Sequence, residues 1–214
     1  MVLEELGPAF IKFGQIMGTR GDLIPSELVY ELKKLQDSVL PFSEKKAVAL
    51  IEQELGKPVS EIIKEFSPTP VAAASIAQVH KATLLEGKEV AVKVQRPGIK
   101  RIIDTDLEIM FYFATAVEKH IPEMKYSNIV KIVEEFDKSI HKELNFVIEA
   151  SSIERFGNNF RKDSTVYVPV CYRNYSTRKV LTMEFVDGIK ISDIEGIDSG
   201  SFEMKIIAQR GAEL

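Results

Sequence analysis

The stretch from Val71 to Gly98 constrains the fold of this chain most strongly. Four small residues at 72–75 predict a tight turn near its start. A β-prone run follows over 76–84, and a second β-prone run occupies 90–94. Because a turn-forming triplet centred on Gly87 separates the two runs, the sequence predicts a β-hairpin.

Lys93 stands in the middle of the second run. Side chains alternate between the two faces of a strand, so Ala91 and Lys93 share one face and the valines at 90, 92 and 94 share the other. A lysine in an apolar strand is costly to bury without an anionic partner. A small-residue loop, a hairpin and a strand lysine hold nucleotide phosphates in protein kinases. The short pattern V-A-V-K alone, however, favours a lysine that reaches from a sheet edge into solvent.

Longer motifs favour the kinase-like interpretation. AAASIAQVHKA at 72–82 precedes VAVKVQRPG at 90–98, and KFGQ at 12–15 and GTRGDLIP at 18–25 lie upstream. Together these motifs resemble the UbiB family of atypical kinase-like proteins, also called the AarF or ADCK family. The resemblance runs from Leu6 to the end of the chain. It implies an α+β fold in which a protein-kinase-like N-lobe, with an antiparallel sheet of about five strands, carries a helical N-terminal extension and a helical insert.

The resemblance divides the chain into three regions. Residues 1–67 are expected to form the helical extension that carries the K-x-G-Q motif. Residues 68–188 are expected to form the kinase-like N-lobe, with the family-specific insert at about 98–140. Residues 189–214 would then begin a C-lobe that is cut short.

Apolar spacing and capping residues predict the helices of the extension. Residues 3–17 carry an apolar stripe, and Ser26 and Ser43 are expected to cap the second and third helices, the third ending at Gly56. Later helices are expected after Gly98, after Ser127 and over 201–214, and two more strands over 165–172 and 178–185. The stripe of the first helix consists of Leu6, Phe10, Phe13 and Met17, and the inward-facing residues of the second are Leu28, Leu32, Leu35 and Val39. A short helix is expected near 60–66. The helix after Gly98 is expected to have an apolar face with Ile99, Ile102, Ile103, Met110, Phe113 and Val117.

The resemblance also implies a nucleotide site assembled from distant segments. Glu149 would hold Lys93 against the phosphates, the K-x-G-Q helix would lie over the site, and a hinge at 183–188 would bond the adenine edge through its backbone. The implied catalytic residues are Lys93, Glu149, Lys12 and Gln15, and the implied nucleotide-binding residues are Ala72, Ala73, Ala74, Ser75, Ala91, Lys93, Glu184 and Val186.

Plain structural alternatives exist for each of these positions. Lys12 and Gln15 would otherwise belong to a solvated helix face, Glu143 and Glu149 would be solvated helix carboxylates, and 183–188 would be a strand end with a glycine turn. The chain also departs from the family pattern. Gly18 replaces a serine, and Asn145 replaces an aspartate, which weakens the expectation that residue 145 binds metal or holds Lys12 because an amide carries no charge.

Composition excludes several classes of protein. The chain has 214 residues, 45% of them hydrophobic and 28% charged, which is typical of a soluble globular domain. Its net charge of −4 argues against a general nucleic-acid binder. A single cysteine, Cys171, excludes an intrachain disulfide and a cysteine zinc cluster. The longest apolar run, 109–117, is too short to cross a bilayer, and no signal-peptide pattern is present.

The resemblance implies ATP and Mg²⁺ as cofactors and a role in the biosynthesis of ubiquinone or a related isoprenoid quinone. Expected partners are a nucleotide, an isoprenoid lipid and quinone-biosynthesis proteins, with no nucleic acid, in a cytoplasmic protein that contacts a membrane peripherally. The chain contains no H-x-D or D-F-G sequence, so it has no assigned metal ligand and is expected to be inactive alone. The alternative is a non-catalytic regulatory or scaffold module that binds nucleotide or lipid.

Overall fold

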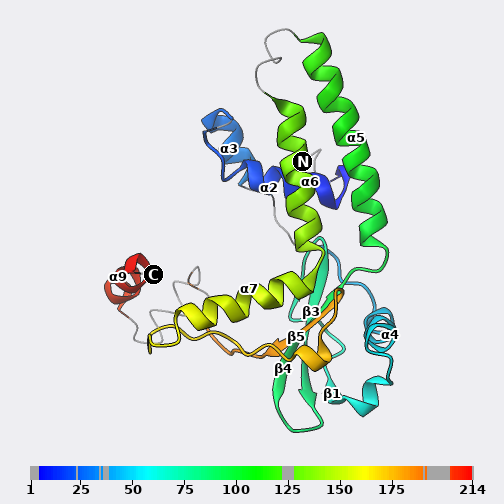
Figure 1. Ribbon diagram of the computed structural model, residues 1–214, viewed down its shortest axis with the longest axis vertical. Coiled ribbons are helices and arrows are strands. Elements are labelled where there is room, and N and C mark those ends of the chain that lie inside the picture. Colours follow the sequence, from blue (N-terminus) through cyan, green and yellow to red (C-terminus); the bar gives the residue numbers. More distant parts are fainter. Residues whose placement is uncertain are drawn as a thin grey trace.

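A computed structural model describes residues 5–22, 24–33, 35, 39–121, 128–189, 191 and 203–213. Its centre is an antiparallel sheet of five strands (Figure 1). The order is β1-β3-β4-β5, and the short β2 also pairs with β3. The strands are β1 (Ile63–Phe66), β2 (Ala72–Ala73), β3 (Ala77–Leu84), β4 (Glu89–Gln95) and β5 (Val180–Glu184).

The predicted hairpin is confirmed as β3 and β4. Val79 lies opposite Lys93, and Lys81 lies opposite Ala91. The turn between the strands contains Gly87 with φ of 83°, a conformation that favours glycine. This register places Lys93 in the interior of the sheet, between β3 and β5.

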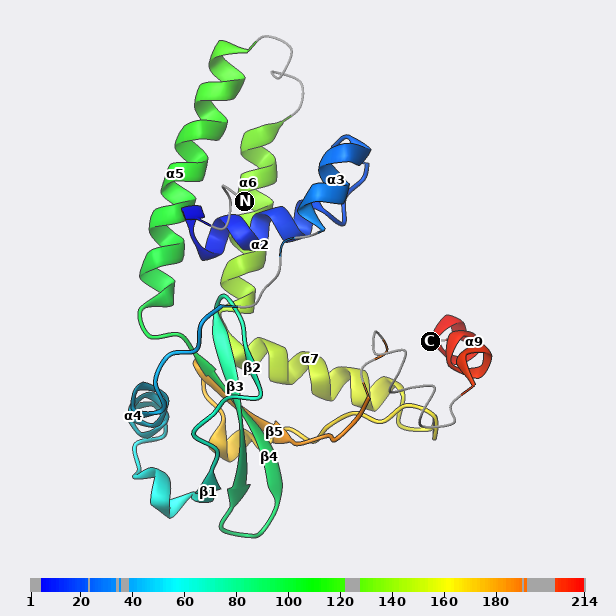
Figure 2. The ribbon, with the colours of Figure 1, turned by 180° about the vertical axis from the view of Figure 1, so that it is seen from behind.

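Helices occupy both faces of the sheet and one end of it. Helices α5 and α6 form a long antiparallel hairpin that rises from the sheet, and α2 lies across this hairpin (Figures 1 and 2). The helices are α2 (Pro8–Met17), α3 (Ser26–Leu32), α4 (Glu44–Leu55), α5 (Ile99–His120), α6 (Ile129–Glu143), α7 (Phe146–Asn159) and α9 (Met204–Glu213), with 3-10 turns η1 (Val59–Glu61) and η3 (Arg173–Tyr175). No helix in these described ranges is both long enough and apolar enough to pass through a bilayer.

Two hydrophobic cores lie on opposite sides of the sheet. On one side, Val92 and its alternate neighbours on β4 pack with Ile51 of α4. On the other side, Leu181 of β5 packs with Ile103 of α5 and Phe146 of α7. These five side chains are almost completely buried, and each contributes about 1.5–3 kcal/mol by leaving water. The cores therefore fix α7 on the face that carries Lys93.

Several predicted elements are wrong in detail. Of the predicted helix near 60–66, only the start is helical, in η1, because Ile63–Phe66 pairs with the edge of β3 as β1. This strand precedes residue 68, so the sheet includes part of the segment assigned to the extension. The run 165–172 forms only one bridge, from Cys171 to Met183, because Pro169 has no N–H to donate.

The helix boundaries also differ from the predictions. Pro25, not Ser26, is the N-cap of α3, and Leu28 on that helix is 54% exposed. Ser43 and Gly56 do flank α4, as predicted. The predicted cap Ser127 and the apolar Phe202 lie outside the described residues. Leu6, Ile102 and Phe113 are exposed, contrary to the prediction, and Val39 lies beyond the end of α3. Leu35 is buried as predicted, although it too lies beyond the end of α3.

Candidate functional site

The predicted ion pair between Lys93 and Glu149 is present. The Lys93 ammonium lies 2.8 Å from both carboxylate oxygens of Glu149. The lysine side chain is 21% exposed and that of Glu149 is 31% exposed, so solvent reaches the pair from one side. The ammonium also lies 4.8 Å from the ring centre of Phe146, at a distance where the ring attracts a cation. The pair joins the middle of β4 to the first turn of α7.

The first turn of α7 is fixed by three bonds to its surroundings. Asn145 is the N-cap, and its side-chain oxygen accepts a bond of 3.2 Å from the Val147 N–H. The N–H of Phe146 donates to the Arg178 carbonyl at 3.1 Å. Gln95 of β4 donates to the carbonyl of Leu144 at 2.8 Å. The observed role of Asn145 is therefore to begin the helix that carries Glu149.

Arg173 of η3 binds α7 one turn beyond Glu149. Its guanidinium makes two bonds, of 2.6 and 2.7 Å, to the carboxylate of Glu154 and one of 2.9 Å to the hydroxyl of Ser151. The bond from Arg173 lowers the pKa of Glu154. This contact was not predicted, because nothing in the sequence near Arg173 indicates which helix it meets.

The alanine-rich turn is held by Arg96. Ala72 and Ala73 form β2, and the N–H of Ala74 donates to the Ala77 carbonyl at 2.8 Å. The guanidinium of Arg96 donates to the carbonyl of Ala74 at 2.8 Å and to that of Leu40 at 2.9 Å. The turn residue Ser75 is buried. Arg96 is the second missed residue, although its position directly after the lysine strand, in VQRPG, could have indicated it.

Lys12 meets Glu143 at the end of α6, with 2.8 Å between the ammonium and the carboxylate. Its side chain is 17% exposed, so Lys12 is not part of a solvated helix face. Gln15 donates to the carbonyl of Leu35 at 3.5 Å, the upper limit for such a bond. The partner of Lys12 in the structure is therefore the first acidic residue of the 143–149 segment, and Gln15 faces the segment that follows α3.

The predicted hinge lies at the end of β5. The N–H of Glu184 donates to the Val170 carbonyl at 2.8 Å, so a bond from Glu184 to an adenine edge would have to use its carbonyl. The Glu184 carboxylate accepts a bond from the Tyr167 hydroxyl, which raises the pKa of that phenol. Val186 is 50% exposed.

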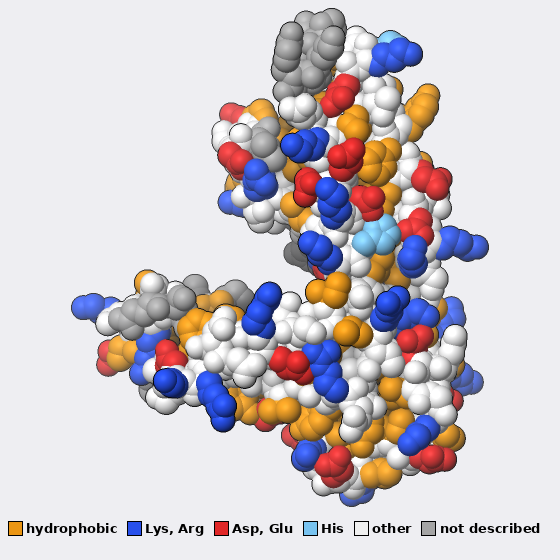
Figure 3. Space-filling model, viewed as in Figure 1, with side chains coloured by type: hydrophobic (Ala, Val, Ile, Leu, Met, Phe, Trp, Pro, Cys, Tyr) orange, Lys and Arg blue, Asp and Glu red, His pale blue; other side chains and the backbone are white. Residues whose placement is uncertain are grey.

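The surface is hollowed between α7 and the end of α2 that leads to α3 (Figure 3). Both ion pairs, Lys93–Glu149 and Lys12–Glu143, involve residues near the junction of α6 and α7. Acidic and basic side chains are interspersed over the α2–α6 part of this face (Figure 3). In the parts of the chain that the structure describes, no group of three or more His, Cys, Asp and Glu side chains is placed to hold a metal ion.

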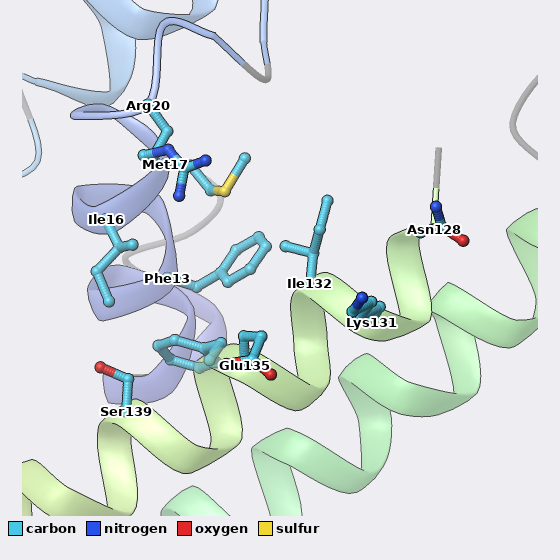
Figure 4. A pocket seen from close by; sticks show the side chains of 10 residues that line it. Phe13, Ile16, Met17, Arg20, Asn128, Lys131, Ile132, Glu135 and Ser139 are labelled. Atoms are coloured by element: carbon cyan, nitrogen blue, oxygen red, sulfur yellow. The ribbon is translucent and has the colours of Figure 1, made fainter. Parts of the chain in front are cut away.

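A separate cavity of about 610 Å³ lies between α2 and α6. Figure 4 shows Phe13 and Met17 of α2 directed toward Ile132 of α6. Arg20, Lys131 and Glu135 are among the lining residues, so the cavity combines apolar side chains with charged groups of both signs. Neither Lys93 nor Glu149 lines this cavity, so the cavity is distinct from the site of that ion pair.

Known protein families, curated proteins and solved structures include matches to this chain. A sequence profile of the ABC1 atypical kinase-like domain matches residues 34–214. Two curated relatives, each named "Probable protein kinase UbiB", come from Marinobacter nauticus and Pseudomonas fluorescens and are 44% and 43% identical over the whole chain. The chain spans only 39% and 40% of the length of these two relatives. A similar solved structure is that of the Rv3197–erythromycin complex from Mycobacterium tuberculosis. It is 30% identical with a TM-score of 0.62, over 90% of this chain and 48% of that one.

Proposed function

Because the chain belongs to the ABC1 family of atypical kinase-like domains, we propose that it forms the nucleotide-binding lobe of an ATP-dependent atypical kinase or ATPase of the UbiB type. The main support for the proposal is the ion pair in which the Lys93 ammonium bonds both carboxylate oxygens of Glu149. Lys93 lies in the middle of a kinase-like sheet. In kinases, the equivalent lysine binds the α- and β-phosphates only when a helix glutamate holds it in place.

The residues around Lys93 fit a nucleotide. Ala91 lies on the same strand face as Lys93, and its small side chain leaves room for a flat base. Met183 lies opposite Ala91 on β5 and is only partly buried, so it extends the apolar surface. The lysine supplies a cation for phosphate, and the face of the sheet supplies an apolar surface for adenine.

Each residue has a defined task in this proposal. Lys93 neutralises phosphate charge, Glu149 orients the ammonium, and the turn held by Arg96 borders the phosphates. ATP, when bound, supplies the transferable phosphoryl group. Because alanine has a Cβ, the turn at 72–74 cannot adopt the positive-φ conformations of a glycine loop, which favours an atypical phosphate geometry. Mg²⁺ accompanies ATP in this proposal, and its ligands belong to the part of the relatives that this chain does not match.

The two relatives are named as probable protein kinases of the UbiB type. From the resemblance to the UbiB family, the proposal extends to a role in ubiquinone biosynthesis, with a small molecule as the phosphoryl acceptor or with ATP hydrolysis as the activity. Lys12 of α2 contacts Glu143 near the proposed site. In this position the α2 helix would occupy space that a protein substrate needs. We include peripheral contact with a membrane in the proposal, because an isoprenoid quinone or its precursor resides there.

The test is titration of the full-length gene product with MgATP. Lys93→Ala should weaken binding at least about tenfold, since it removes a charged bond worth about 1.5–3 kcal/mol. Lys88→Ala is the matched control, because Lys88 also pairs with a carboxylate but lies in the exposed β3–β4 turn. Equal affinity of wild type and Lys93→Ala for MgATP would contradict the proposal.

The alternative is a non-catalytic module that binds a ligand and acts through partners. The cavity between α2 and α6 favours it, because its volume is that of a small-molecule site and it lies away from Lys93. The same titrations separate the two functions, since a module of this kind would bind its ligand with or without Lys93 and turn nothing over.

A further inference from the structure

The N-terminus of α2 has no cap of its own. The N-cap position is Gly7, which has no side chain, and the first helical residue is Pro8, which has no N–H. The first turn also contains no acidic residue. The free N–H groups that begin every helix must be satisfied by other groups, and they attract negative charge.

The side chain of Asp106, on α5, lies at the N-terminus of α2. Asp106 is 97 residues away in the sequence from Ala9, to which it bonds. Its carboxylate accepts a bond of 3.3 Å from the N–H of Ala9. The residue is only 7% exposed, and burial raises the pKa of its carboxyl group while the bond from Ala9 opposes that change. A buried carboxylate is costly unless something compensates it, and here the positive end of α2 does so.

Gly7 permits this contact in two ways. Its φ of +130° lies in the region that favours glycine. A Cβ atom added to it would also lie 2.9 Å from the carboxylate oxygen Oδ2 of Asp106, closer than such atoms approach one another. The backbone before α2 is therefore shaped to receive the aspartate.

Contacts along α2 connect this cap to the candidate site. One turn beyond Ala9, the rings of Phe13 and Phe136 meet edge to face at 5.2 Å. Beside Phe13, Lys12 pairs with Glu143. Glu143 ends α6, and the cap of α7 follows two residues later. Helix α2 is thus held on α5 at its start and on α6 at its middle, and its lysine touches the junction that leads to Glu149.

We propose that Asp106 is a positioning residue, which docks the start of α2 on α5 and thereby places Lys12 at the α6–α7 junction. The docking stands on the contacts described above. The effect on nucleotide binding rests on the proposed function.

The test compares Asp106→Ala with wild type in the full-length gene product. Removing a bond to a buried carboxylate should raise the hydrogen exchange of the α2 amides about tenfold or more, with the β3 and β4 amides unchanged. Lys12 should react several-fold faster with an acetylating reagent, measured by mass spectrometry with Lys88 as the internal reference. Glu108→Gln is the control, because it removes an exposed carboxylate two residues further along α5. If Asp106→Ala does not fold, Gly7→Ala replaces it, because the added Cβ would displace the Asp106 carboxylate.

MgATP titrations of Asp106→Ala, Lys12→Ala and the double variant complete the test. If Asp106 acts through Lys12, the loss of affinity in Asp106→Ala should disappear in the Lys12→Ala background. Unchanged exchange in α2 and unchanged labelling of Lys12 would overturn the docking. A full loss of affinity that persists without Lys12 would overturn the role of Asp106 in placing that lysine. If the proposed function is wrong, the wild-type protein will not bind MgATP. Hydrogen exchange of α2 and labelling of Lys12 would still show whether Asp106 docks α2 on α5.

Discussion

His80 is a fully buried titratable side chain at the centre of a polar network in β3. Its Nδ1 lies 2.8 Å from the carbonyl of Ser67, which can only accept, so Nδ1 carries the proton. Its Nε2 then accepts a bond of 2.7 Å from the amide of Gln78, which also bonds both backbone groups of Phe42. The imidazole is therefore neutral, and burial lowers its pKa despite the opposing effects of the Ser67 carbonyl and of Glu44.

This shift predicts loss of stability in acid. Below the ordinary histidine pKa of about 6.5 the unfolded chain binds a proton that the folded chain does not, so the free energy of unfolding falls as the pH falls. In urea unfolding at pH 7.5 and 5.5, His80→Ala should lose less stability between the two pH values than wild type does. The variant should nevertheless be at least about 2 kcal/mol less stable than wild type at pH 7.5, because the partners of His80 lose their bonds. His141→Asn is the control of opposite sign. Although burial opposes it, bonds to Asp137 and Asp104 raise the pKa of His141, so removing that histidine should deepen the loss. An unchanged acid response in His80→Ala would contradict this assignment.

At the scale of the element, α7 is the part on which the candidate site depends, because it carries Glu149 one turn after its N-cap. Asn145→Ala should cost about 1 kcal/mol of stability in urea unfolding, since it removes the cap of that turn. It should also weaken MgATP binding, because the first turn of α7 would then fray around Glu149. Asn145→Asp is the matched control and should retain wild-type stability, since aspartate caps as well as asparagine and adds a favourable charge. A variant Asn145→Ala as stable as wild type would show that other contacts set the start of α7.

The elements that the sequence predicts correctly are those with strong local signals. The β3–β4 hairpin needs only two β-prone runs and the turn at Gly87, and α4 needs only its flanking residues. The pairing of Lys93 with Glu149, 56 residues apart, could be predicted only from resemblance to a family. β1 was missed because a strand of four residues gains its stability from its partner β3. Asp106 gave no signal as a cap, because the helix that it caps lies 97 residues away.

At the scale of the whole molecule, the candidate site is assembled from four separate parts: the sheet, α7, the end of α6 and the α2 helix. The two ion pairs connect these parts near the α6–α7 junction. The described residues provide a cation for phosphate and a carboxylate to orient it, but no group of side chains suited to hold a metal. Under the proposed function, the described residues thus supply groups that would bind a nucleotide, and the groups that would activate it are not among them.

The last prediction follows from this division. The purified 214-residue chain should release no phosphate from MgATP above background, because phosphoryl transfer needs bound metal and a group that positions the nucleophile. The chain should still bind the nucleotide through Lys93, so titration and phosphate-release assays on one preparation should give different answers. Lys93→Ala should remove the binding, and Lys88→Ala should retain it. Steady release of phosphate by the wild-type chain, abolished in Lys93→Ala, would mean that this segment already contains the groups that activate ATP, and that they lie at Lys93 in an arrangement unlike that of protein kinases.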